Sequence, residues 1–243
     1  MYALIYYIKR FIPSKVETKR LKKILYLGLP SALHSFFEVA FFISAVWMSG
    51  FIGKNSQAAN QIALNLASMT YMVALGVGVA AMIRVGNQMG TMNFKKLREV
   101  ALSTILLIVF IDIVFCLIFL LFNDYLPLLY LDANNPSNLT DVNQVLDIAS
   151  KLLIIAGVFQ LFDGIQAVVL GALRGMQDVN KPAVIIFLSY GVIGFPISYY
   201  LGFYTSLSMV GIWLGLLSGL FSSSLFLFLR FNYLSRKIIR LND

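Results

Sequence analysis

The sequence predicts an all-α membrane protein, a bundle of six transmembrane helices. Of its 243 residues, 59% are hydrophobic and only 12% are charged, whereas a soluble domain carries roughly 25% charged residues. Six apolar windows are each long enough to cross a hydrocarbon core of about 30 Å, which takes about 20 helical residues. Membrane-spanning β-strands would be about ten residues long and alternate in polarity, so these windows predict helices.

The elements follow one another in a simple order. An apolar stretch, Met1–Ile8, is interpreted as the end of a preceding transmembrane helix, and the basic segment Lys9–Lys23 as a cytoplasmic linker. The bundle then fills residues 24–232, and residues 233–243 are predicted to form a cytoplasmic tail. The six windows are Leu25–Phe51, Gln57–Ile83, Val100–Phe122, Leu152–Leu173, Pro182–Phe203 and Met209–Phe231.

Several residues in the windows or directly beside them predict local features. Proline removes a hydrogen bond from a helix, so Pro30 in the first window and Pro196 in the fifth predict hinges or kinks. The single cysteine, Cys116, lies in the third window; it excludes a disulfide framework and is interpreted as a packing residue. Small residues that would let neighbouring helices approach closely are Gly76, Gly78, Gly171 and Gly175.

The basic residues predict the orientation of the chain. All of the 19 Lys and Arg residues except Lys54 and Lys151 fall on one side of the predicted bundle. Because cytoplasmic loops are enriched in Lys and Arg, we expect an inner-membrane protein with both termini in the cytoplasm. The segment Asn123–Asp147, which has acidic but no basic residues, fits an external loop. The net charge of +8 therefore reflects topology and predicts no nucleic-acid partner; membrane lipids are the expected surroundings.

Three carboxylates, Glu38, Asp112 and Asp163, lie near the middle of their windows. A charge at the bilayer centre costs about 2.5–3.5 kcal/mol on insertion scales. No Lys or Arg lies at a similar depth, so these groups either take up a proton or hold a cation, and they predict a coupling-ion site. The alternative is a protonated or water-bridged group that helps helices associate. This alternative is favoured for Asp112, which has only apolar neighbours and Cys116 one turn away.

Polar neighbours distinguish the other two carboxylates. Asp163 has the amides of Gln160 and Gln166 three residues away on its own helix, and Glu38 has the only histidine, His34, one turn earlier. His34 is interpreted either as a proton relay to Glu38 or as a satisfied packing residue. A polar group in the second window either lines a cavity or forms interhelical hydrogen bonds; it comprises Asn60, Gln61 and Asn65.

Enzyme chemistry is not indicated by the sequence. It contains no phosphate-binding G-x-x-x-x-G-K-[ST] loop, no H-E-x-x-H or Cys/His zinc motif, and no serine nucleophile elbow with a histidine beside it. No cofactor is therefore expected apart from a coupling ion. The sequence favours a helical bundle that moves a solute and is driven by an ion gradient.

Three segments resemble the multidrug and toxic compound extrusion (MATE) family, close to its bacterial NorM-like branch. They are LGLPSALHSFFEVAFF, QIALNLASMTYMVALGVGVAAMIRVGNQMG and FQLFDGIQAVVLGALRGMQDVNKP. The resemblance covers nearly the whole chain and implies the second six-helix lobe of a twelve-helix transporter. It further implies export of cationic, amphipathic, drug-like compounds in exchange for Na⁺ or H⁺. The partner implied is an N-terminal six-helix lobe, on the same longer chain, on a separate chain or in a homodimer.

The resemblance also implies a cation site at Glu38, Tyr71 and Asp163. Na⁺ would be held by the two carboxylates, and the ring face of Tyr71 would attract a monovalent cation. One turn before Asp163, where NorM-like relatives carry a tyrosine, this chain has Phe159, which lacks the hydroxyl ligand. The choice between Na⁺ and H⁺ therefore stays open.

Two alternatives to a transporter lobe are weighed against the sequence. The chain is either a transporter lobe or a non-transporting remnant or fragment that lacks a first lobe, and the sequence leaves open whether Met1 is the natural start. A flippase for lipid-linked sugars would need a cleft lined with Lys or Arg, and no window has a mid-span basic residue. The sequence does not name the transported compound.

Overall fold

The computed structural model describes residues 18–131 and 139–242, and this part contains helices and no strands. The predicted helix end Met1–Ile8 and most of the predicted linker lie outside the described residues. The helices are α2 (Thr18–Ile52), α3 (Lys54–Gly90), α4 (Phe94–Leu121), η1 (Leu126–Leu129), α5 (Leu139–Gly175), α6 (Asn180–Phe187), η3 (Leu188–Gly194), α7 (Phe195–Phe203) and α8 (Ser208–Asn242). Six helical stretches are long and apolar enough to cross a membrane, with α6, η3 and α7 forming one of them. The predicted fold class is therefore confirmed.

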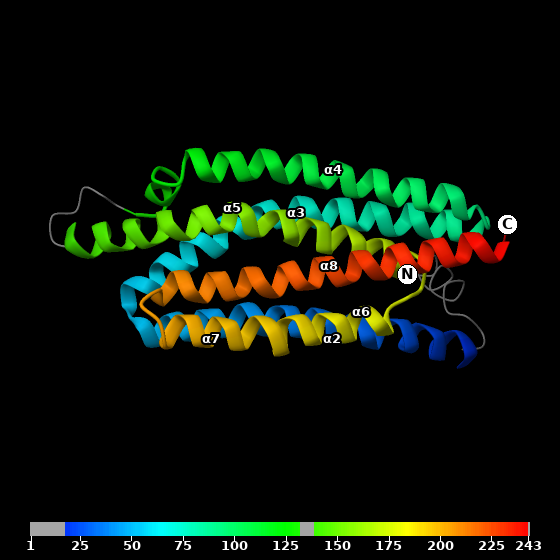
Figure 1. Cartoon of the computed structure of the whole chain (residues 1–243), viewed down its shortest axis with the longest axis horizontal. Coiled ribbons are helices and arrows are strands. Elements are labelled where there is room, and N and C mark those ends of the chain that lie inside the picture. The colour runs from blue at the N-terminus through cyan, green and yellow to red at the C-terminus, as the bar shows by residue number, and fades with distance from the viewer. Residues whose placement is uncertain (1–17, 132–138, 243) are drawn as a thin grey trace, which may run out of the picture.

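The bundle has α3, α4 and α5 on one side and α2, α6 and α7 on the other, with α8 between them (Figure 1). Consecutive spans run in opposite directions. The connections from α3 to α4 and from α5 to α6 lie at the same end as the start of α2 and the end of α8 (Figure 1). Most of the Lys and Arg residues fall in these segments, so the positive charge gathers at one end of the bundle.

Several helices are longer than the apolar windows that predicted them. α2 begins at Thr18, within the predicted linker, and α5 begins at Leu139, within the predicted external loop. An apolar window marks the part of a helix that faces hydrocarbon, whereas polar turns can continue the helix beyond it. At the start of α5, one such turn is anchored by Asn55 Nδ2, which donates to Asp141 Oδ1 at 3.1 Å.

The two prolines in the spans behave differently. α2 continues as an α-helix through Pro30. Pro196 is the second residue of α7 and directly follows the π-helical segment η3, Leu188–Gly194. Because proline lacks an N–H group and its ring collides with the carbonyl four residues earlier, a wider turn before it accommodates the ring. The predicted irregularity is thus present in the fifth span as a change of helix type.

Glycines let α3 and α5 touch backbone to backbone. A Cβ at Gly78 would lie 2.9 Å from the carbonyl oxygen of Ala167, and a Cβ at Gly171 would overlap the carbonyl group of Gly78. The prediction of close approach at Gly78 and Gly171 is confirmed. Gly76 has no atom within 4 Å of its Cβ position, so the same prediction is wrong there. The contact places α5, with Asp163, firmly beside α3, with Tyr71.

Candidate functional site

The three residues of the predicted cation site line one cavity of about 330 Å³. Glu38 comes from α2, Tyr71 from α3 and Asp163 from α5. Asn65 and Phe159 also line it, and no Lys or Arg is among its lining residues. The cavity therefore combines two carboxylates with largely apolar walls, an arrangement in which a monovalent cation or a proton would balance the negative charge.

Glu38 is held by donors from two other helices. Tyr71 Oη donates to Glu38 Oε1 at 3.1 Å, and Gln166 Nε2 donates to the same oxygen at 3.3 Å. Gln166 in turn accepts a hydrogen bond of 2.7 Å from Tyr190 Oη. In this series of hydrogen bonds, Tyr190 donates to Gln166, and Gln166 and Tyr71 donate to Glu38. The carboxyl group of Glu38 therefore acts as an acceptor. Tyr190 was not predicted from the sequence, because only the packing of η3 in the bundle, mainly on α8, brings it within reach of Gln166.

Asp163 differs from Glu38 in having an unsatisfied oxygen. Its side chain is 6% exposed, and Oδ1 has no hydrogen-bond partner in the part of the chain that the structure describes. Asp163 interacts electrostatically with Glu38, which has the same sign of charge. A buried carboxylate with a free lone pair beside a second carboxylate is suited to hold a proton or a cation.

His34 contacts a basic residue that the sequence did not indicate as its partner. Its Nδ1 lies 3.1 Å from Nη2 of Arg174, at the end of α5. Because arginine only donates, Nδ1 must accept, and His34 is neutral with its proton on Nε2. Arg174 also interacts electrostatically with Glu38, so a basic group does lie within range of the site. The relay from His34 to Glu38 remains a prediction, since no hydrogen bond joins them among the described residues.

The structure places the remaining predicted residues in different environments: some are buried between helices, one lines the cavity and one is exposed. Asn60 is fully buried, and its Oδ1 accepts a hydrogen bond of 2.9 Å from Trp213 Nε1 on α8. Gln61 is exposed and lies outside the cavity, which leaves Asn65 as the member of this group that lines it. The interpretation as an interhelical hydrogen bond therefore describes Asn60, and cavity lining describes Asn65. Asp112 is buried and does not line the cavity.

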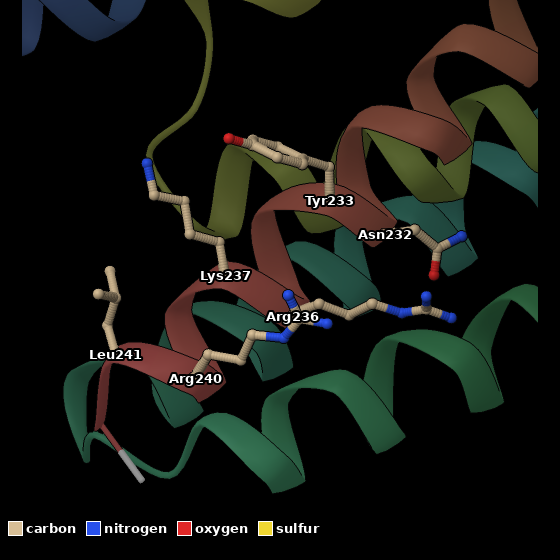
Figure 2. Close-up of a pocket in the computed structure, with 6 residues that line it drawn as sticks. All are labelled: Asn232, Tyr233, Arg236, Lys237, Arg240 and Leu241. Atoms are coloured by element: carbon tan, nitrogen blue, oxygen red, sulfur yellow. The ribbon is translucent and has the colours of Figure 1, made fainter.

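A second hollow, of about 510 Å³, lies at the last turns of α8 and is basic (Figure 2). Figure 2 shows its charged side chains extending in different directions from one stretch of helix. Its lining residues are Asn232, Tyr233, Arg236, Lys237, Arg240 and Leu241. It shares no residue with the cavity at Glu38 and includes no acidic side chain, so it is not part of the candidate ion site.

The family model described as MatE matches residues 30–200, which is more than half of the chain. The chain belongs to the MatE family. The matched residues include all three members of the cavity site, Glu38, Tyr71 and Asp163. The resemblance seen in the sequence is thereby confirmed.

Relatives of this MatE chain include proteins named as probable multidrug resistance protein NorM. The one from Rhizobium meliloti (strain 1021) is 36% identical over 216 residues, covering 89% of this chain and 45% of the relative. The one from Bacillus subtilis (strain 168) is 34% identical over 223 residues, covering 92% and 47%. The chain therefore spans about half the length of the curated relatives it matches.

Solved structures support the same fold. An outward-facing multidrug resistance MATE family transporter of the MOP superfamily has a TM-score of 0.80 at 21% identity, covering 95% of this chain and 50% of that one. A crystal structure of MATE in the bent conformation has a TM-score of 0.80 at 20% identity, covering 96% and 49%. The MatE chain thus has the fold of half of a MATE transporter.

Proposed function

We propose that this chain is the second lobe of a secondary active multidrug exporter, a transporter and not an enzyme. Glu38, Tyr71 and Asp163 bind the coupling ion, Na⁺ or H⁺, and cationic amphipathic compounds leave as the ion enters. The chain lies in the inner membrane with both termini in the cytoplasm, where residues 9–23 link it to a first six-helix lobe. The names of the relatives and the half-length match support this proposal.

The observation that carries the proposal is the shared cavity of Glu38 and Asp163. The two carboxylates come from helices far apart in the sequence, face one space and interact electrostatically. A bound ion changes an equilibrium between two packings only if it binds one of them more tightly. Groups on α2 and α5 meet that condition, because a relative displacement of the two helices changes the geometry around the ion.

Export is the first test. The chain, expressed together with a first six-helix lobe in bacteria that lack their own multidrug exporters, is expected to expel ethidium. Asp163→Asn and Glu38→Gln are expected to abolish this export without lowering the amount of protein in the membrane. Asp147→Asn is a matched control, because Asp147 is an exposed carboxylate on the same α5 helix and pairs with Lys151. Export at the parent rate by Asp163→Asn would refute the proposal.

Ion binding tests the site separately from export. Trp213 lies 5.6 Å, ring centre to ring centre, from Phe159, which lines the cavity. The chain has two tryptophans, so Trp47→Phe leaves Trp213 as the single fluorophore. We expect Na⁺ or a pH step to change its fluorescence in the parent and not in Asp163→Asn. A signal without export would identify the chain as a lobe that binds the ion but does not support transport.

The flippase alternative is not supported by the cavity. Binding of a lipid-linked sugar phosphate requires basic side chains at the substrate. The cavity at Glu38 has none among its lining residues, and the basic hollow on α8 shares no residue with it. We therefore propose drug export alone.

A further inference from the structure

The basic hollow at the end of α8 is lined by two neighbouring rows of side chains from that helix. The first row is Asn232, Arg236 and Arg240, and the second row is Tyr233, Lys237 and Leu241. Residues four apart lie one turn above another on a helix, so each row follows one side of α8. Figure 2 shows Arg236 and Arg240 on the side of Asn232, and Lys237 on the side of Tyr233. The hollow therefore has cationic groups along both of its sides.

The three cations of the hollow have no acidic partner in the described part of the chain. Arg230, which lies one turn before them, forms an ion pair of 2.8 Å with Asp178. In contrast, Arg236, Lys237 and Arg240 are exposed and form no ion pair within residues 18–131 and 139–242. A group of cations without counter-charges produces a positive potential that attracts an anion.

Helix α4 adds a fourth cation at the edge of the hollow. Arg98 Nη1 donates to Ser235 Oγ at 2.7 Å, and Arg98 Nη2 donates to Asn232 Oδ1 at 2.8 Å. Arg98 also interacts electrostatically with Arg236, which has the same sign of charge. A guanidinium group has more N–H donors than these two bonds use. Guanidinium groups bind phosphate by paired hydrogen bonds, so a phosphate group near Arg98 and Arg236 would offset their repulsion.

The hollow lies at the depth of lipid headgroups. The apolar window of α8 ends at Phe231, and Arg236 and Arg240 follow it by about 8 Å and about 14 Å along the helix. The headgroup layer on each side of a bilayer is about 5–8 Å thick. Long side chains on a helix lean toward its N-terminus, which for the end of α8 is the direction of the membrane. The two guanidinium groups therefore reach back toward the phosphate groups of the lipids.

An exposed apolar row leads from the membrane to the hollow. Leu225, Leu229 and Tyr233 are spaced four residues apart, and they are 40%, 54% and 59% exposed. Lys237 continues this row into the hollow. An acyl chain can lie along such a row while its headgroup occupies the hollow, whereas a soluble phosphate ester would leave the row unused. The apolar row therefore favours a phospholipid over a free phosphate.

We propose that this hollow binds the headgroup of an anionic phospholipid. Arg98, Arg236 and Arg240 contact the phosphate group, Lys237 adds positive charge, and one acyl chain lies along the apolar row that begins at Leu225. The bound lipid joins α4 to α8. It is not the transported compound, because the hollow shares no residue with the cavity at Glu38. This inference goes beyond the proposed function and does not depend on the coupling ion.

The test measures binding of dioleoyl phosphatidylglycerol to the full chain in detergent, with native mass spectrometry to count the lipid molecules retained. The variant carries Arg236→Gln, Lys237→Gln and Arg240→Gln together. It is expected to weaken binding by about tenfold or more, since a basic residue near a membrane surface contributes roughly fivefold. Glutamine is a good helix former, so the end of α8 is expected to stay helical. Binding at the parent level by this variant would overturn the proposal.

A matched control separates a site from the general effect of charge. Lys22, Lys96 and Lys181 are exposed at the same end of the bundle and do not line the hollow (Figure 1). Replacing all three by Gln removes the same charge as the α8 variant. We expect this control to retain phosphatidylglycerol like the parent. Equal weakening by the two triple variants would show a diffuse attraction and overturn the proposal.

Two further probes identify the ligand. Dioleoyl phosphatidylcholine has the same acyl chains but no net charge, and it is expected to bind about tenfold more weakly or less. Glycerol 3-phosphate has the charge but no acyl chain, and at the concentration of the lipid it is expected to displace none of it. Equal retention of the two lipids would overturn the role of the cations. Displacement by glycerol 3-phosphate at equal concentration would identify a site for soluble phosphate esters and overturn the lipid.

The parent protein gives a measurement that needs no variant. A ligand that binds only the folded state raises its unfolding temperature. Phosphatidylglycerol is therefore expected to stabilise the parent in detergent more than phosphatidylcholine does, and equal stabilisation would contradict the proposal. Asp163→Asn is expected to keep this difference even where export is abolished, so the result for the lipid is independent of the proposed transport.

Discussion

Tyr71 Oη on α3 donates a hydrogen bond of 3.1 Å to Oε1 of Glu38 on α2, and this bond joins the two helices at the wall of the cavity. The resemblance to MATE transporters implied that Tyr71 contributes its ring face to a cation. In the structure the hydroxyl group of Tyr71 makes a separate contact, because it donates to the Glu38 carboxylate and so restricts the orientation of that group.

Tyr71→Phe distinguishes the hydroxyl group from the ring. A hydrogen bond to a charged group contributes about 1.5–3 kcal/mol, so we expect cation binding to weaken by about tenfold or more, since 1.4 kcal/mol is about a factor of ten. The measurement is the Trp213 fluorescence titration in the Trp47→Phe background. Tyr71→Leu removes the ring as well and is expected to weaken binding further. Equal binding by Tyr71→Phe and the parent would assign the contribution to the ring face.

Phe159→Tyr is expected to increase affinity for Na⁺. Phe159 lines the cavity and is 1% exposed, so a hydroxyl group added to its ring would enter surroundings with few competing donors. One added oxygen ligand is expected to tighten Na⁺ binding on the order of tenfold, a typical contribution of a polar contact to a charge. The same titration measures it, with Phe159→Leu as the control without a hydroxyl group. Unchanged affinity for Na⁺ would show that the new oxygen does not reach the ion.

Gly171→Ala is expected to destabilise the bundle. A Cβ at residue 171 would overlap the carbonyl group of Gly78, and overpacking typically costs about 1–3 kcal/mol. Gly76→Ala is the matched control, because nothing lies within 4 Å of its Cβ position. Replacing glycine by alanine in an open helical position stabilises a helix by up to about 1 kcal/mol. Thermal unfolding in detergent should therefore move in opposite directions for the two variants; a parallel change would contradict the contact.

The predicted orientation is tested by cysteine labelling. Lys54→Cys and Lys237→Cys, each in a Cys116→Ala background, place one exposed thiol at opposite ends of the bundle. If both termini are cytoplasmic, a membrane-impermeant maleimide labels residue 54 in intact cells and labels residue 237 only after the membrane is opened. The reverse pattern would invert the topology.

The sequence predicted the parts of this protein that depend on composition and on single residues. The six spans follow from apolar length. The three residues that the family resemblance indicated, Glu38, Tyr71 and Asp163, line one cavity, and their role in binding a cation stays a prediction. The helix ends at Thr18 and Leu139 were not predicted, because polar turns outside the membrane carry no apolar pattern.

The remaining contacts depend on which helices become neighbours. Nothing in the local sequence indicates that Arg174 reaches His34, or that Tyr190 donates to Gln166. Asp112 shows the same effect. Along α4 it has apolar neighbours, and only the packing of α5 brings Gly164 and Asp163 to it.

The backbone contact between α3 and α5 has a mechanical consequence for the site. α3 and α5 meet at Gly78 and Gly171 with no side chains between their backbones. No deformable side-chain packing is therefore present there to let one helix slide past the other. α3 and α5 therefore form one rigid frame, which carries Tyr71 and Asp163. Glu38 belongs to α2 and is connected to this frame by the hydrogen bonds that it accepts from Tyr71 and Gln166. An ion that binds the carboxyl group of Glu38 acts on the one member of the site that lies outside this frame. The smallest movement that such a site can produce is a shift of α2 against an otherwise unchanged frame.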